Sequence, residues 1–134
     1  MARDEVMEMT DDELRVKAGE LRGWKMSVFG NWPWQMVPPD GDGSQVRNWN
    51  CPDYPHDIAA AMELFDRLPM SCGIEQGYEG ILGRGPCGYV CGFGDWEWSG
   101  TDVMDQSWHN EFWDESICRA ITRAFVFAMT QETV

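Results

Sequence analysis

The hydrophobic and polar positions of the first thirty residues predict a helix followed by a strand. Thr10 and Glu13 form a Thr-x-x-Glu capping box, in which each side chain satisfies a backbone N–H at the start of a helix. We expect this helix over residues 11–22, ended by Gly23, and three apolar residues line one of its faces: Leu14, Ala18 and Leu21. Apolar and polar residues then alternate over 24–29 with the period of a half-buried strand.

A second helix is predicted after a long loop. Residues 30–55 hold so many prolines and glycines that no regular element is expected there, and the tryptophans among them indicate that the loop packs on the domain. Beyond the loop, Ile58, Met62 and Phe65 recur at i, i+4 and i+7, and Pro69 ends the run. We expect this apolar face to be buried against a sheet.

The second half of the chain predicts a small sheet and a last helix. Short strands are expected over about 71–78 and 88–93, divided by a glycine-rich turn region. The alternation at 96–98 extends the second strand or forms a further one. Residues 101–110 are polar and are expected to be a connection, and the third helix is expected over about 114–131.

These elements follow the order helix, strand, loop, helix, two or three strands, helix. A hairpin-like pair of strands has to be antiparallel, and amphipathic helices need an apolar face to cover. The sequence therefore predicts an α+β fold in which three helices pack with a small, mainly antiparallel sheet of three to four strands. Residues 1–134 are typical in length of a single domain, and we expect residues 1–9 to be flexible.

The charge balance excludes several classes of function. Asp and Glu number 23 against 10 Lys and Arg, so the formal net charge is −13, which repels phosphate backbones and makes direct nucleic-acid binding unexpected. Hydrophobic residues, at 43%, are too frequent for a disordered acidic tail. The N-terminus lacks the basic start of an export signal, and no apolar run is long enough for a membrane span. We expect a cytoplasmic protein that does not bind membranes.

The residues with catalytic or metal-binding potential form no recognisable motif. The five cysteines are an odd number without a Cys-x-x-Cys pair, so we expect free thiols. A zinc site built from Cys51, Cys87, Cys91 and His109 is disfavoured, because a strand would hold the sulfurs of Cys87 and Cys91 about 13 Å apart. His56 and His109 stand in no motif that positions a general base, and surface positions with local hydrogen bonds are favoured. We expect no cofactor and no enzyme activity.

Acidic and aromatic residues are the candidates for binding a partner. Seven acids fall within residues 4–20, and such a surface either is a solvated helix face or mimics the phosphates of nucleic acid. The tryptophans of the 30–55 loop and of 96–98 either cover the core or anchor an interface, where tryptophan is enriched. The predicted partner-binding residues are Asp4, Glu5, Glu8, Asp11, Asp12, Trp32, Trp34, Asp95, Trp96, Glu97 and Trp98.

Four segments of the chain together carry a family resemblance. They are Trp24-Lys25 after the first helix, a loop rich in tryptophan and proline, Tyr54-Pro55-His56-Asp57-Ile58-Ala59-Ala60-Ala61 opening a helix, and Ile117-Cys118-Arg119-Ala120 in the last helix. Over about 12–129 the chain resembles the phage ABA-sandwich domain proteins, small proteins of phages and prophages. The family usually carries a Ser or Thr pair where this chain has Pro55 and His56, so the helix cap differs. The resemblance implies helices on a sheet and a phage origin, and it transfers no catalytic or ligand-binding residue.

We therefore expect a non-enzymatic phage or prophage accessory protein that acts by binding in the cytoplasm of a bacterial host. The leading hypothesis is an acidic inhibitor of a host nucleic-acid-binding defence protein, of the anti-defence or anti-CRISPR type. The partner would then be a host protein with a basic surface, and a homo-oligomer is compatible with the sequence. The alternative is a small-molecule binder that sequesters an anionic nucleotide signal, with phosphate held by Arg47, Arg84 and Arg119.

Overall fold

The computed structural model describes residues 1–27, 31–41, 49–69, 72–77, 88–98 and 106–131. Over these residues the α+β class is confirmed, with four helices and two small antiparallel sheets. In chain order the elements are α1 (Arg3–Glu8), α2 (Asp11–Leu21), β1 (Lys25–Met26), β2 (Met36–Val37), α3 (Ile58–Phe65), β3 (Cys72–Gly77), β4 (Gly88–Trp98), β5 (Gln106–Asp114) and α4 (Ile117–Thr130).

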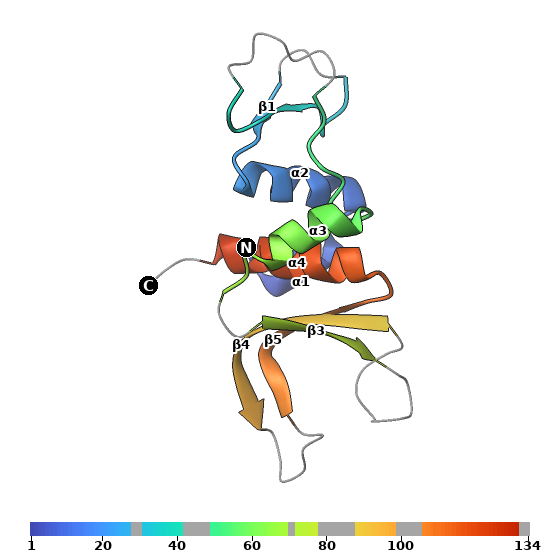
Figure 1. The fold of residues 1–134 in the computed structure, drawn as a ribbon, viewed down its shortest axis with the longest axis vertical. Helices are drawn as coiled ribbons and strands as arrows, with labels where there is room; N and C mark the ends of the chain where they lie inside the picture. The colour runs from blue at the N-terminus through green and yellow to red at the C-terminus, as the bar shows by residue number, and fades with distance from the viewer. Residues whose placement is uncertain (28–30, 42–48, 70–71, 78–87, 99–105, 132–134) are drawn as a thin grey trace.

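Helix α4 occupies the centre of the molecule. It contacts β4 and β5 on the sheet and also contacts α1, α2 and α3, while the β1–β2 pair lies beyond α2, at the far end from the three-stranded sheet (Figure 1). Within α4, Ile121, Ala124 and Val126 are fully buried, as expected for a helix covered on several sides. Between α4 and the sheet, the ring of Phe127 lies 5.3 Å from that of Phe112 and 6.2 Å from that of Phe93.

The first predicted helix is confirmed together with its cap. The Thr10 hydroxyl accepts the Glu13 backbone N–H at 3.2 Å, and the Glu13 carboxylate accepts the Thr10 N–H at 3.1 Å. Leu14 and Ala18 are fully buried. Gly23 follows the helix with a φ of +96°, a left-handed conformation that glycine adopts without the steric cost of a Cβ.

Within the N-terminal segment that we expect to be flexible, Arg3–Glu8 form the short helix α1. The Arg3 guanidinium lies over the Phe112 ring, 4.3 Å from its centroid, and donates a hydrogen bond to the Glu111 carbonyl. Val6 is fully buried in the core. A six-residue helix is too short to show a periodic apolar face, and these contacts with other elements are what stabilise it.

The expected loop over 30–55 contains a strand that the sequence does not reveal. Met36 and Val37 form β2, are buried, and pair with the two residues of β1 in antiparallel register. Of the strand predicted over 24–29, Lys25 and Met26 form β1, and residues 28–29 lie outside the described residues. Two-residue strands are too short to show an alternation of apolar and polar residues, so the sequence does not predict this pairing. The two strands meet because the chain folds back over α2.

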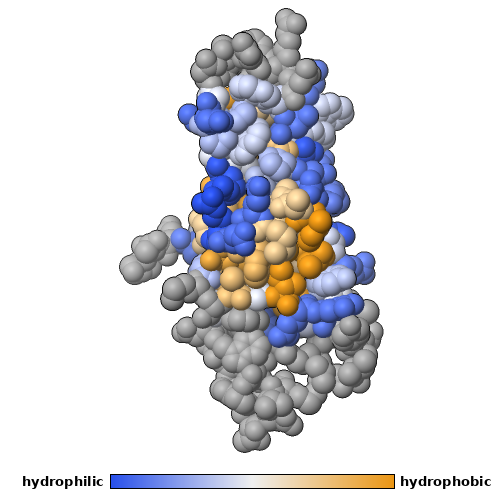
Figure 2. All heavy atoms as spheres, viewed as in Figure 1, coloured by the Kyte–Doolittle hydropathy of each residue, from blue (hydrophilic) through white to orange (hydrophobic). Residues whose placement is uncertain are grey.

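The predicted face of the second helix is wrong. Ile58 is 50% exposed and Met62 is 36% exposed, whereas Ala60, Ala61 and Leu64 are buried. The buried face contacts α4, and the small alanine side chains allow two helices to approach closely. Figure 2 shows hydrophobic residues on the surface over the middle of the molecule, where α3 lies in Figure 1. Residues 58, 62 and 65 thus form a stripe that is largely solvent-facing, although Phe65 also touches the core.

The three-stranded sheet has the order β3-β4-β5 and is antiparallel throughout. Among the described residues this sheet has three strands, fewer than the four that the prediction allowed, and β4 continues through 96–98 as one strand with an irregularity between Phe93 and Trp96. The polar connection expected over 101–110 is wrong from Gln106 onward, because Gln106–Asp114 form β5 and pair with β4. The polar residues of β5 have no strand signal of their own, and pairing with β4 places them in a strand.

Candidate functional site

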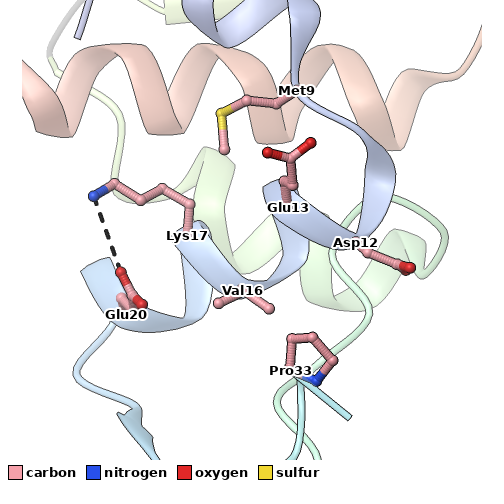
Figure 3. Close-up of a pocket in the computed structure, with 7 residues that line it drawn as sticks. All are labelled: Met9, Asp12, Glu13, Val16, Lys17, Glu20 and Pro33. Atoms are coloured by element: carbon pink, nitrogen blue, oxygen red, sulfur yellow. Dashed lines mark ion pairs between the residues drawn. The ribbon is translucent and has the colours of Figure 1, made fainter.

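Helices α1 and α2 present two adjoining surface hollows lined by acidic residues. The first has a volume of about 290 Å³ and is lined by Met9, Asp12, Glu13, Val16, Lys17, Glu20 and Pro33 (Figure 3). The second, of about 380 Å³, is lined by Met1, Glu5, Glu8, Met9 and Glu13. Because Met9 and Glu13 belong to both, the two hollows form one continuous surface, called here the acidic surface.

The apolar part of the first hollow comes from three segments. Met9 precedes α2, Val16 lies on α2, and Pro33 belongs to the segment between β1 and β2 (Figure 3). Met9 occupies the position before the Thr10 cap, where a hydrophobic residue often packs against the first turn of the helix. The methionine side chain is flexible and adapts to irregular surfaces. The hollow is therefore an apolar patch with an acidic rim.

The acidic surface is poorly neutralised. Its linings contain five carboxylates and two cations. Lys17 has its Nζ 4.0 Å from the Glu20 carboxylate, and the N-terminal ammonium of Met1 donates to the Thr130 carbonyl at 3.2 Å. Two arginines of the same helices point elsewhere: Arg3 contacts β5, and Arg15 donates to the Cys51 carbonyl oxygen from Nε at 3.0 Å and from Nη2 at 2.7 Å. An exposed pair at 4.0 Å contributes little, so a strong negative potential remains.

Three of the five predicted acids in residues 4–12 line this surface, and a fourth is exposed but lines neither hollow. Glu5, Glu8 and Asp12 line the hollows, and Asp4 is exposed on α1. Within the described part of the chain, Asp4, Glu8 and Asp12 form no ion pair. Their charges are therefore available to a partner.

Asp11 differs from the other four acids because it is held within the fold. One carboxylate oxygen lies 2.8 Å from Nε2 of His56, and the other lies 3.8 Å from Nε of Arg119. Nδ1 of His56 lies 3.0 Å from the Asp53 carboxylate. The hydrogen bond to Asp53, supported by the one to Asp11, raises the pKa of His56 above its usual 6.5. Asp11 thus connects α2 to the turn before α3 and to α4.

Trp32 and Trp34 form a stacked aromatic column beside the first hollow. Their ring centroids are 5.3 Å apart at an interplanar angle of 9°, and the Arg15 guanidinium lies over Trp34 at 5.2 Å. Trp32 is 58% exposed. Since Pro33 stands between the two tryptophans and lines the hollow, the sequence-predicted acids and these two tryptophans lie on neighbouring surfaces.

The second predicted aromatic group lies elsewhere. The backbone of 95–98 belongs to β4, with Trp96 opposite Trp108 and Glu97 opposite Ser107. This end of β4 is at the opposite end of the molecule from β1–β2 (Figure 1). The side chains of Asp95, Trp96, Glu97 and Trp98 lie outside the described part of the structure, so their role in binding stays a prediction.

The residues weighed for catalysis or ligand binding are engaged or buried where they are described. Burial raises the pKa of the Cys51 and Cys118 thiols, and raises that of Cys91 to about 12. Both ring nitrogens of the exposed His56 face carboxylates. Arg119 lies between Asp11 and Asp114, whose carboxylate is 3.4 Å from its Nε. Arg47, Arg84, Cys87 and the His109 side chain fall outside the described residues.

The described residues contain neither a group of metal ligands nor a membrane-spanning helix, and the chain matches no known protein family, curated protein or solved structure. Within the described ranges, no three His, Cys, Asp or Glu side chains are grouped to hold a metal ion. None of the helices described is long and apolar enough to cross a bilayer. Comparison with protein-family models, with curated proteins and with solved structures finds no match.

Sequence reasoning finds the acids of this surface but not its apolar part. Met9 could have been found, because its place directly before a capping box is a known packing position. Val16 and Pro33 carry no such signal. They meet only because the chain after β1 returns to α2, where the Cys51 N–H donates to the Trp34 carbonyl and Arg15 holds the Cys51 carbonyl.

Proposed function

We propose that this protein acts by binding, and that its acidic surface docks on the basic surface of a protein whose usual ligand is nucleic acid. The observation that carries the proposal is the lining of the two hollows, in which five carboxylates surround one lysine and two methionines. A basic channel that binds phosphates releases counterions when it binds carboxylates, so the same driving force serves both ligands.

The spacing of the acids supports this proposal. Asp4 and Glu8 are one helical turn apart on α1, about 6 Å along its axis, and Asp12 lies in the first turn of α2. Rigid helices hold these charges in fixed positions, which lowers the entropy lost on binding. The formal net charge of −13 adds long-range attraction to a basic partner.

The proposed partner is a host nucleic-acid-binding defence protein, and the proposed effect is to block it within the bacterial cytoplasm. The phage origin rests on the resemblance of the four segments given above. The acid-lined surface provides the chemistry by which such a block would work.

The test compares two variants that remove equal charge. D4N/E8Q/D12N neutralises Glu8 and Asp12 of the acidic surface and the exposed Asp4 of α1, none of which forms an ion pair within the described residues. E63Q/D66N/E115Q neutralises three exposed acids on other parts of the chain. Tagged wild-type protein captures partners from a bacterial lysate, and each purified partner is then assayed for release of a labelled DNA duplex.

We expect the wild type and the control variant to displace the duplex, with association slowing as salt rises from about 50 to about 200 mM. D4N/E8Q/D12N should displace it less well at low salt. If this variant acts as well as the wild type, or if no captured partner loses its nucleic acid, the proposal is wrong.

A further inference from the structure

The first hollow combines an apolar floor with an acidic rim, and this combination restricts what can fill it. Its volume of about 290 Å³ lies at the lower end of the range for small-molecule sites, and it is open to solvent rather than enclosed. Met9, Val16 and Pro33 provide the apolar surface. A site of this size and shape suits one aliphatic side chain projecting from a larger partner.

The rim selects the charge of that partner. Asp12 and Glu20 lie one helical turn before and after Val16 on α2, about 6 Å away along the helix axis in each direction. Glu13 adds a third carboxylate, and Lys17 is paired with Glu20. An apolar segment would leave these carboxylates without compensating charge, and an acidic one would be repelled. Charge complementarity therefore requires basic residues on both sides of the aliphatic one.

The neighbouring tryptophan column indicates which basic residue fits best at one end. Trp32 stacks on Trp34, Trp34 carries the Arg15 guanidinium, and Arg15 is fixed by two hydrogen bonds to the Cys51 carbonyl. The indole of Trp32 is thus held in place while remaining 58% exposed. A guanidinium is planar and weakly hydrated, so it stacks on an indole better than a lysine ammonium does.

We infer that the first hollow and Trp32 together bind one short basic amphipathic segment of a partner protein, with an aliphatic side chain against Val16 and an arginine stacked on Trp32. This inference rests on the proposed function and names the chemistry of the partner's contact segment. It adds an apolar and an aromatic anchor to a surface that charge alone would leave unspecific.

The experiment uses fluorescent synthetic peptides as probes for the full-length protein. The parent peptide is a nine-residue amphipathic peptide of arginines with two leucines. In a second peptide serine replaces leucine, and in a third lysine replaces arginine. Binding is measured by fluorescence anisotropy for the wild type, V16S and W32A. M26A is the control, because Met26 is 69% exposed on β1 and does not line the hollow.

For the wild type, we expect the serine peptide to bind about five- to tenfold more weakly than the parent and the lysine peptide about two- to fivefold more weakly. V16S should lose the preference for leucine, and W32A should lose the preference for arginine, while M26A keeps both. Thermal unfolding of each variant shows whether it is folded, and the peptide series on the wild type does not depend on any variant.

Equal binding of the three peptides to the wild type overturns the inference, and so does binding of none of them at about 50 mM salt. Retention of the leucine preference by folded V16S also overturns it. The proposed function is judged separately, by whether D4N/E8Q/D12N loses displacement of DNA relative to E63Q/D66N/E115Q. If D4N/E8Q/D12N displaces less DNA than the control variant but the wild type binds the three peptides equally, the proposed function stands and the inference is wrong.

Discussion

Replacing Leu64 or Ile58 by alanine, one at a time, tests which face of α3 is buried. Leu64 is fully buried where α3 contacts α4, and Leu→Ala at such sites costs about 2–5 kcal/mol, depending on how far the cavity collapses. Ala60 and Ala61 already hold the two helices close, which leaves little room for collapse, so we expect a loss of at least about 3 kcal/mol. Ile58 is 50% exposed, and alanine has the better helix propensity, so its replacement should cost about 1 kcal/mol or less.

The free energy of unfolding is measured by urea titration followed by tryptophan fluorescence, which the eight tryptophans make sensitive. A change in midpoint at constant slope reports stability. For a domain of this size 1 kcal/mol corresponds to about 3–5 °C in melting temperature, so L64A should melt about 10 °C lower than the wild type and I58A within about 4 °C of it. M26A, at a 69% exposed position, serves as the control.

Two results would refute the packing described for α3. Equal losses of stability in L64A and I58A would mean that the helix is buried on both faces. A larger loss in I58A would mean that the stripe of Ile58, Met62 and Phe65 faces the core, as the periodicity of the sequence alone predicts. In the second case the alanine face could not be the contact with α4.

Two further predictions concern protonation and thiol chemistry. Because Asp53 and Asp11 raise the pKa of His56, the stabilisation from protonated His56 is complete below about pH 6.5 and is lost as pH rises through the folded-state pKa. H56Q should therefore remove that decline in unfolding free energy between about pH 6 and 8, and an unchanged decline would assign it to another group. With a thiol reagent, the half-buried Cys72 should react before the buried Cys91, whose pKa of about 12 leaves almost no thiolate. In urea all five cysteines should be labelled without reductant, and fewer than five labels would indicate a disulfide.

The acids of the candidate site could be predicted from the sequence, but their separate roles could not. Asp11 and Asp12 are adjacent in the chain and identical in chemistry, yet Asp11 faces His56 and Arg119 whereas Asp12 lines the hollow. Neighbouring residues on a helix point about 100° apart, so the position of α2 against α3 and α4 decides which acid is internal. Similarly, Val16 becomes part of a site only because Pro33 is brought beside it.

Elements whose signals are local can be predicted from the sequence. The capping box of α2, the glycine after it and the strands around 72–77 and 88–98 depend on residues close together in the chain, and the structure contains all of them. Three elements, α1, β2 and β5, are too short or too polar to carry a pattern in the sequence. They form because of contacts with parts of the chain that are distant in sequence. Tertiary structure also decided which face of α3 is buried. Periodicity marks the face with the larger apolar side chains, but packing two helices closely requires small ones, and the position of α4 selected the alanines.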